Sequence, residues 1–143
     1  MMSLNEIYNH KILELISLDK CDLSNANLKN LDENIFNLTT IKELNLSENH
    51  LEFIPETISN LSNLKWLILS DNKLEVLPQS IGELEKLEGL YLSGNKLNSL
   101  PQNIVKLKKL KYLSLLENEK LVLSDEQKYW IEELKNSGCR ILI

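Results

Sequence analysis

The sequence predicts an α/β solenoid, a right-handed curved stack with a parallel β-sheet on its concave face and short helical turns on its convex side. Three segments of 23 residues, 41–63, 64–86 and 87–109, align with one another without a gap. Each segment carries apolar residues at fixed positions but is too small to bury them alone. The units must therefore stack and share one continuous core.

Two columns of this alignment indicate where the chain turns. An asparagine column follows the expected strand, and its side-chain amide can satisfy backbone groups of the turn and of the next unit. A proline column begins the return segment, where a fixed φ and a missing N–H are tolerated. The asparagines are Asn49, Asn72 and Asn95, and the prolines are Pro55, Pro78 and Pro101.

The same frame extends in both directions with departures. Residues 18–40 keep the apolar positions, but Ala26 replaces the asparagine and Asp32 replaces the proline. We expect the first rung of the asparagine ladder to be missing, as befits an atypical end unit. Residues 110–123 keep Asn118, gain one residue and have Ser124 in place of proline.

The ends of the chain predict caps on a single domain that spans residues 1–143. Residues 1–17 begin with the capping-box pair Ser3 and Glu6 and then show helical apolar spacing, although a strand could begin near Ile12. Residues 124–143 predict a helix followed by one last strand. The helix begins with a second capping box, Ser124 with Gln127, and continues with an apolar stripe of Trp130, Ile131 and Leu134. It is expected to stop at Asn136-Ser137-Gly138. The strand is indicated by the alternation of Cys139, Ile141 and Ile143 with other residues.

The spacing L-x-x-L-x-L-S-x-N-x-L-x-x-L-P-x-x-I-x-x-L resembles the leucine-rich repeat over residues 18–124. It is similar to the 23-residue L-P-x-x-I-x-x-L subtype of bacterial and intracellular eukaryotic proteins. The closing helix and G-C-R-I-L-I resemble the C-terminal cap of bacterial members. The resemblance implies an interaction scaffold, but the binding site has to be inferred from the surface residues, because a fold alone does not define a function.

Composition argues against several classes of partner. The net charge is −5 with both signs interspersed, which argues against nucleic acid or an anionic membrane. No apolar run approaches the ~20 residues of a membrane span. The first 20 residues lack the pattern of a secretory signal.

The two cysteines, Cys21 and Cys139, lie near opposite ends of the chain and outside any C-x-x-C pair. We expect both to be reduced and buried, with no disulfide and no zinc site. A cytoplasmic protein fits this expectation, and export with the signal removed is the alternative.

The concave face carries the candidate binding site. The first two repeats are polar there, whereas the later ones place apolar and aromatic residues on adjacent strands. Trp66 and Tyr112 are expected to flank Gly89 as two walls over a glycine floor, forming a slot for a flat or apolar side chain. The candidate partner-binding residues are Trp66, Ile68, Gly89, Tyr91, Tyr112 and Leu116.

A simpler interpretation is that these aromatics only suit a sheet, or that Trp66 packs on the stems of Lys42 and Lys65. The leading hypothesis is a monomeric, non-enzymatic scaffold for a protein or peptide. The alternative is a structural or self-associating protein that dimerises through the aromatic patch or an end strand. No catalytic motif, phosphate-binding loop or metal-ligand spacing is present, so no catalytic residue, cofactor or metal is predicted.

Overall fold

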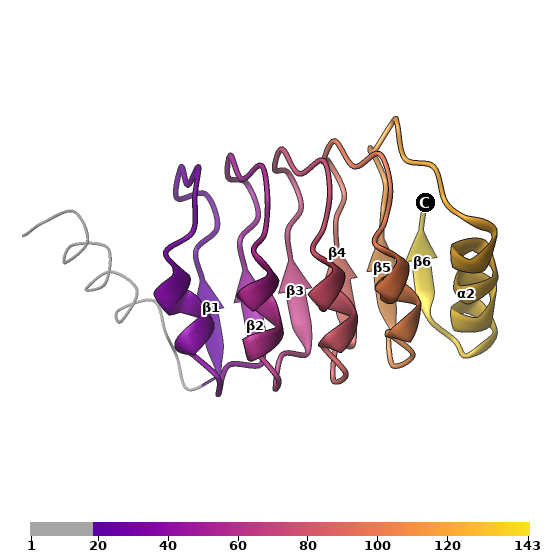
Figure 1. Cartoon of the computed structure of the whole chain (residues 1–143), viewed down its shortest axis with the longest axis horizontal. Coiled ribbons are helices and arrows are strands. Elements are labelled where there is room, and N and C mark those ends of the chain that lie inside the picture. Colours follow the sequence, from indigo (N-terminus) through magenta and orange to yellow (C-terminus); the bar gives the residue numbers. More distant parts are fainter. Residues whose placement is uncertain (1–18) are drawn as a thin grey trace, which may run out of the picture.

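The computed structural model describes residues 19–143, which form one stack around a single parallel sheet (Figure 1). The predicted N-terminal cap, residues 1–17, lies outside the described residues. The sheet follows chain order, and the first five strands start 23 residues apart. The strands are β1 (Lys20–Asp22), β2 (Glu43–Asn45), β3 (Trp66–Ile68), β4 (Gly89–Tyr91), β5 (Tyr112–Ser114) and β6 (Arg140–Leu142).

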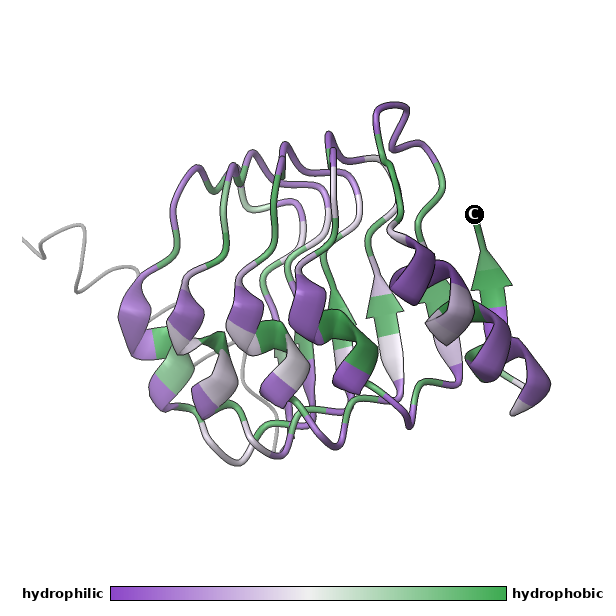
Figure 2. Cartoon of the chain, turned by 45° about the vertical axis from the view of Figure 1, so that its right-hand side comes forward, coloured by the Kyte–Doolittle hydropathy of each residue, from purple (hydrophilic) through white to green (hydrophobic). Residues whose placement is uncertain are grey.

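The helical pieces line the side of the stack opposite the exposed face of the sheet (Figures 1 and 2). This arrangement confirms the predicted solenoid. Four of them are five-residue 3₁₀ turns, and the last is a full α-helix. They are η1 (Glu33–Asn37), η2 (Glu56–Asn60), η3 (Gln79–Glu83), η4 (Gln102–Lys106) and α2 (Asp125–Asn136).

Each proline of the repeat immediately precedes a 3₁₀ turn in extended backbone, as the sequence predicts; at Pro78, φ is −68°. The first repeat reaches the same geometry by a different route. Asp32 has φ −72°, and its carboxylate accepts a hydrogen bond from the N–H of Asn34 at 2.9 Å. A polar cap therefore replaces the proline there.

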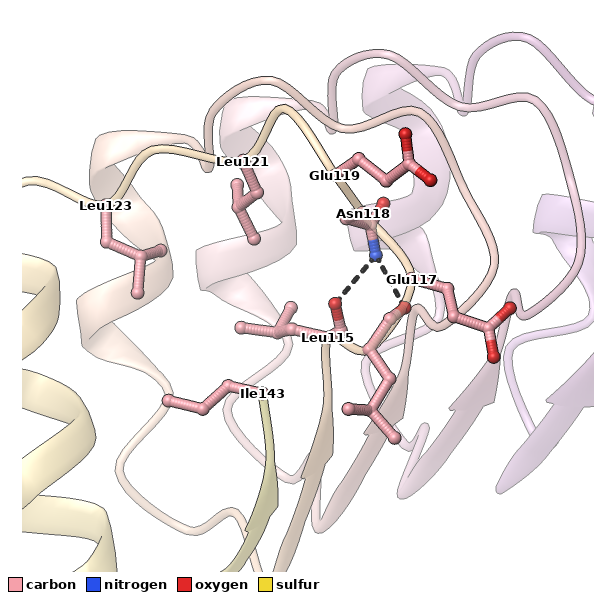
Figure 3. A pocket seen from close by; sticks show the side chains of 8 residues that line it. Leu115, Glu117, Asn118, Glu119, Leu121, Leu123 and Ile143 are labelled. Atoms are coloured by element: carbon pink, nitrogen blue, oxygen red, sulfur yellow. Dashed lines mark hydrogen bonds between the residues drawn. The ribbon is translucent and has the colours of Figure 1, made fainter.

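The asparagine ladder forms, but it is directed to the preceding repeat and not to the next one. The amide oxygen of Asn95 accepts from the N–H of Leu74, and its Nδ2 donates to the carbonyls of Leu69 and Leu92, each at 3.0 Å. Figure 3 shows the equivalent amide of Asn118, whose Nδ2 donates to the carbonyls of Leu115 and Leu116 in its own turn. The preceding unit is the partner because its loop runs beside the turn with free N–H and C=O groups.

The first rung is absent at Ala26, as predicted. The amide oxygen of Asn49 instead accepts from the N–H of Ala26 at 3.1 Å and of Leu28 at 2.9 Å. The first repeat is thus held by the second without contributing an amide of its own.

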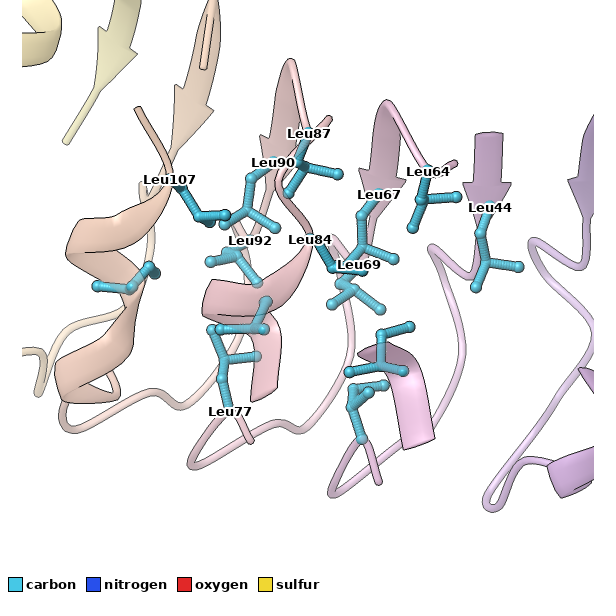
Figure 4. Packing of buried hydrophobic residues seen from close by; sticks show 14 of the residues in the cluster. Leu44, Leu64, Leu67, Leu69, Leu77, Leu84, Leu87, Leu90, Leu92 and Leu107 are labelled. Atoms are coloured by element: carbon cyan, nitrogen blue, oxygen red, sulfur yellow. The ribbon is translucent and has the colours of Figure 1, made fainter. Parts of the chain in front are cut away.

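The core is a layer of leucines from every repeat, and Figure 4 shows those of neighbouring units pointing between strands and helical turns. Leu67, Leu69 and their equivalents in the second and fourth repeats have no exposed surface. The C-terminal cap closes this layer with Trp130, which is 1% exposed and donates from Nε1 to the carbonyl of Leu107 at 3.1 Å. Burial of this shared layer holds the stack together.

The C-terminal cap follows the prediction closely. The Ser124 hydroxyl accepts from the N–H of Gln127 at 3.2 Å, and the Gln127 side chain accepts from the N–H of Ser124 at 3.1 Å. Helix α2 ends at Asn136, and Gly138 has φ +90°, which favours glycine. Strand β6 then pairs with β5 in parallel.

Both cysteines are free and buried, as predicted. Burial raises the pKa of the Cys21 thiol to about 11, so it is a protonated core residue at neutral pH. Over residues 19–143, no helix has the length and apolar character to span a membrane.

The ladder predicts that Asn95→Ala destabilises the protein by roughly 1–3 kcal/mol, because buried backbone groups of two repeats lose their partner. Urea unfolding followed by circular dichroism measures this. The matched control is Asn98→Ala, since Asn98 is exposed and, among the described residues, its side chain hydrogen-bonds only with the Ser99 hydroxyl. Equal stability of the two variants would contradict the role assigned to the ladder.

Candidate functional site

The register of the sheet places two rows of side chains on its concave face. Pairing in register brings the first residue of each strand together in one row and the third residue in another. The first row is Lys20, Glu43, Trp66, Gly89, Tyr112 and Arg140, and the second is Asp22, Asn45, Ile68, Tyr91, Ser114 and Leu142. Five of the six candidate residues therefore lie on three adjacent strands.

The aromatic side chains form one continuous series, called here the aromatic row: Trp66, Tyr91 and Tyr112. This series crosses between the two rows of the sheet, because Trp66 and Tyr112 belong to the first row and Tyr91 to the second. The Trp66 and Tyr91 ring centroids are 6.4 Å apart at 30°, and those of Tyr91 and Tyr112 are 5.6 Å apart and stacked. All three rings are half-buried. Partial burial, followed by the neighbouring Tyr112, raises the pKa of Tyr91, so it is neutral at physiological pH.

The predicted slot over Gly89 is wrong. Gly89 is buried, and a Cβ added to it would lie 2.2 Å from Cε3 and 2.5 Å from Cζ3 of Trp66. The Trp66 ring therefore lies over the glycine and fills the space that the slot would need. Gly89 serves to let Trp66 lie flat and approach Tyr91, so the face presents a packed aromatic surface.

Arg140 extends this surface and is not among the candidate residues predicted from the sequence. Its Cζ lies 5.4 Å from the centroid of the Tyr112 ring, within the range of a cation–π contact. The signal was present in the sequence, because the C-terminal alternation puts Arg140 and Leu142 on the same side of the last strand. It becomes specific only once β6 is paired with β5 in register.

The other end of the face is polar, as predicted. Lys20 and Glu43 form an ion pair at 2.9 Å. Asp22 accepts hydrogen bonds from the backbone and hydroxyl of Ser24. The change from polar to aromatic therefore falls between β2 and β3.

Charged residues border the aromatic row on both sides. Directly before the strands, Glu88 pairs with Lys65 at 3.2 Å and with Lys111 at 2.7 Å. Hydrogen bonds from Lys111 and then Lys65 lower the pKa of Glu88, which keeps it ionised. Beyond the strands, Asp71 and Glu117 are exposed at positive φ.

Leu116 does not join the aromatic row. It is 41% exposed and lies two residues beyond β5. There it lines a pocket of about 300 Å³ with Leu115, Leu121, Leu123 and Ile143 (Figure 3). This predicted site residue therefore belongs to a separate apolar surface at the C-terminal end.

The pocket lies where the sixth strand continues the core beyond the fifth repeat. By register, Ile141 and Ile143 take the places that Leu113 and Leu115 hold in the fifth repeat. Leu113 has no exposed surface, whereas Ile141 is half-buried and Ile143 is 62% exposed. In the part of the chain that the structure describes, no three His, Cys, Asp or Glu side chains gather to hold a metal ion.

Comparisons with known proteins agree with this geometry. A family model described as "Leucine-rich repeat region" matches residues 56–136, and another described as "Leucine rich repeat" matches residues 16–74. The chain belongs to the leucine-rich repeat family. The finer 23-residue subtype stays a prediction. A search of curated proteins gave no significant match.

Solved structures of this family resemble the chain. A leucine-rich repeat protein of Leptospira interrogans is 38% identical over 80% of this chain and 28% of its own, with a TM-score of 0.68. The ectodomain of the Arabidopsis thaliana receptor kinase GASSHO1/SCHENGEN3 is 35% identical over 65% of this chain and 11% of its own, with a TM-score of 0.56.

An internalin of Listeria monocytogenes shares the fold, with a TM-score of 0.70 and 18% identity over 99% of this chain and 38% of its own. The Leptospira interrogans protein is bacterial, in line with the predicted resemblance to bacterial members. This leucine-rich repeat chain spans well under half the length of each of the three.

The contact between Gly89 and Trp66 predicts that Gly89→Ala displaces the indole and disturbs the Trp66–Tyr91 packing. The expected cost is about 1–3 kcal/mol, typical of overpacking. Thermal unfolding and the near-ultraviolet circular dichroism of the aromatic rings check this.

A double-variant cycle supplies the control. In a Trp66→Ala background the methyl group no longer meets the indole and its closest remaining contact is Tyr91 Cε2 at 3.2 Å, so adding Gly89→Ala should cost markedly less. The same cost in both backgrounds would contradict the contact.

Proposed function

We propose that this leucine-rich repeat protein is a non-enzymatic scaffold that binds a protein or peptide through the aromatic row on its concave face. One observation carries the proposal: Trp66, Tyr91 and Tyr112 form a continuous, half-buried series on the open face of the sheet. Aromatic side chains held in a fixed arrangement are the usual anchors of protein interfaces. Nucleic acid is not part of the proposal, given the net charge of −5.

The rigidity of the row supports this role. Each ring packs against the next, and the missing side chain of Gly89 leaves the space that the Trp66 ring fills. A partner would therefore meet side chains that are already ordered, which lowers the entropy cost of binding. Ile68 lies in register beside Tyr91 and adds apolar surface.

One of the similar structures supports a binding role. The receptor kinase ectodomain of Arabidopsis thaliana was solved in complex with CASPARIAN STRIP INTEGRITY FACTOR 2. We carry over only the general role of a binding scaffold, because this chain covers 11% of that protein.

The alternative is self-association, and the exposed C-terminal end favours it specifically. Ile143 is 62% exposed, and the neighbouring Leu116 is 41% exposed. A second copy could cover these side chains. We propose a monomer, which size-exclusion chromatography with light scattering tests directly; a stable dimer that Ile143→Lys dissociates would favour the alternative.

We propose the cytoplasm as the location, supported by two free, buried thiols. Export with the signal removed is the alternative. Fractionation of the source cells, followed by immunoblotting, distinguishes the two.

The binding proposal predicts that Trp66→Ala and Tyr91→Ala each abolish capture of a partner from native lysate. Because the rings pack on one another, each variant should also lose about 1 kcal/mol of stability while staying folded. Quantitative mass spectrometry of the captured proteins measures the first effect, and thermal unfolding the second.

The matched control is Tyr129→Ala, which removes an aromatic ring that is 67% exposed on α2. It should capture the same partner as the wild type. Partner capture retained by both Trp66→Ala and Tyr91→Ala would remove the aromatic row from consideration.

A further inference from the structure

We infer that the partner segment is acidic: an extended peptide that presents a large apolar side chain to Trp66 and Tyr91 and a carboxylate to Arg140. This inference rests on the proposed function and names the chemistry of its partner. Three observations carry it: the state of Arg140, the local charge, and the spacing between β3 and β6.

Arg140 provides an exposed positive charge that a carboxylate of the partner can reach. Its side chain is exposed, and its guanidinium is held against the Tyr112 ring at 5.4 Å. Among the described residues it forms no ion pair, whereas Lys20, the other cation in the same row, is paired with Glu43. A guanidinium stacked on an aromatic face keeps its N–H groups at the edge, where they can bind a carboxylate in a bidentate manner.

The charge differs between the two sides of the aromatic row. On the side of the first row, Lys65, Lys111 and Arg140 contribute three positive charges against the single negative charge of Glu88, a net of +2, whereas the exposed Asp71 and Glu117 lie on the other side. The chain as a whole has a net charge of −5. A positive area on an acidic protein favours a segment of the opposite sign.

The charged residues on the two sides of the aromatic row also determine the path of the bound peptide. Lys65 and Lys111 directly precede Trp66 and Tyr112, so the positive charges lie beside the first row. The carboxylates of Asp71 and Glu117 lie beyond the second row and would repel an acidic chain. The peptide therefore runs over the first row, across the strands.

The sheet sets the spacing within the peptide. Trp66 and Arg140 occupy the same row on β3 and β6, three strand separations apart. At ~4.8 Å per strand this is roughly 14 Å, which an extended chain at ~3.4 Å per residue covers in about four residues. The apolar and acidic residues of the partner should therefore lie four positions apart.

Selection from a phage-displayed library of random nonapeptides tests the inference. Wild-type protein should enrich peptides with Trp, Phe or Leu four residues from Asp or Glu. Arg140→Gln should lose the acidic preference but keep the apolar one. Circular dichroism confirms that the variant is folded.

Fluorescence polarisation with one enriched peptide, labelled with fluorescein, then measures the contact. Arg140→Gln, and Glu→Gln in the peptide, should each weaken binding about tenfold, and the two changes together should weaken it little further. Glu88→Gln should act in the opposite direction and tighten binding, because it releases Lys65 and Lys111.

Four results would overturn the inference. Three are enrichment of Lys or Arg, no enriched sequence, and unchanged affinity in Arg140→Gln. The fourth is tighter binding of a labelled single-stranded oligonucleotide than of the acidic peptide. The proposed function is judged separately, because partner capture that depends on Trp66 and Tyr91 would stand even if the partner proved neutral or basic.

Discussion

Each repeat is tied to the one before it by backbone hydrogen bonds that recur at equivalent residues. Lys65 donates to the carbonyl of Lys42, and Glu88 and Lys111 continue the series, at 2.7–2.8 Å. The asparagine ladder adds a side-chain bond at the same interval. Any slip in the frame would break these bonds together and expose the leucine layer. The constant interval is therefore the constraint on which the core, the helical turns and the concave face all depend.

This constraint also separates structural from functional residues. The leucines, asparagines and prolines are fixed by their contacts with the neighbouring repeats. The outward residues of each strand are not, so a row can change from an ion pair at Lys20 and Glu43 to aromatic rings at Trp66 and Tyr112 without a change in the backbone. The chemistry of the concave face is therefore determined by the outward residues of each strand, whose identity the fold does not fix.

Periodicity made the solenoid, the strand register and the C-terminal cap predictable, because each depends on spacing alone. The details that the sequence did not show depend on how side chains meet in space. The repeat pattern gave Asn95 a ladder but not its direction, which the course of the neighbouring loop decides. The pattern showed that Gly89 leaves space above the sheet, but not that the Trp66 ring fills this space, because that depends on the rotamer of Trp66. Arg140 gained a role only through its contact with Tyr112.

The rows on the concave face have a consequence for how such a protein can change. Trp66 and Arg140 belong to units joined by the same bonds, so loss or duplication of the unit at residues 87–109 would leave every joint of the same kind intact. The distance between the two side chains would change by one strand separation, ~4.8 Å. The spacing of side chains on the concave face can therefore change in whole strand separations without redesign of the core.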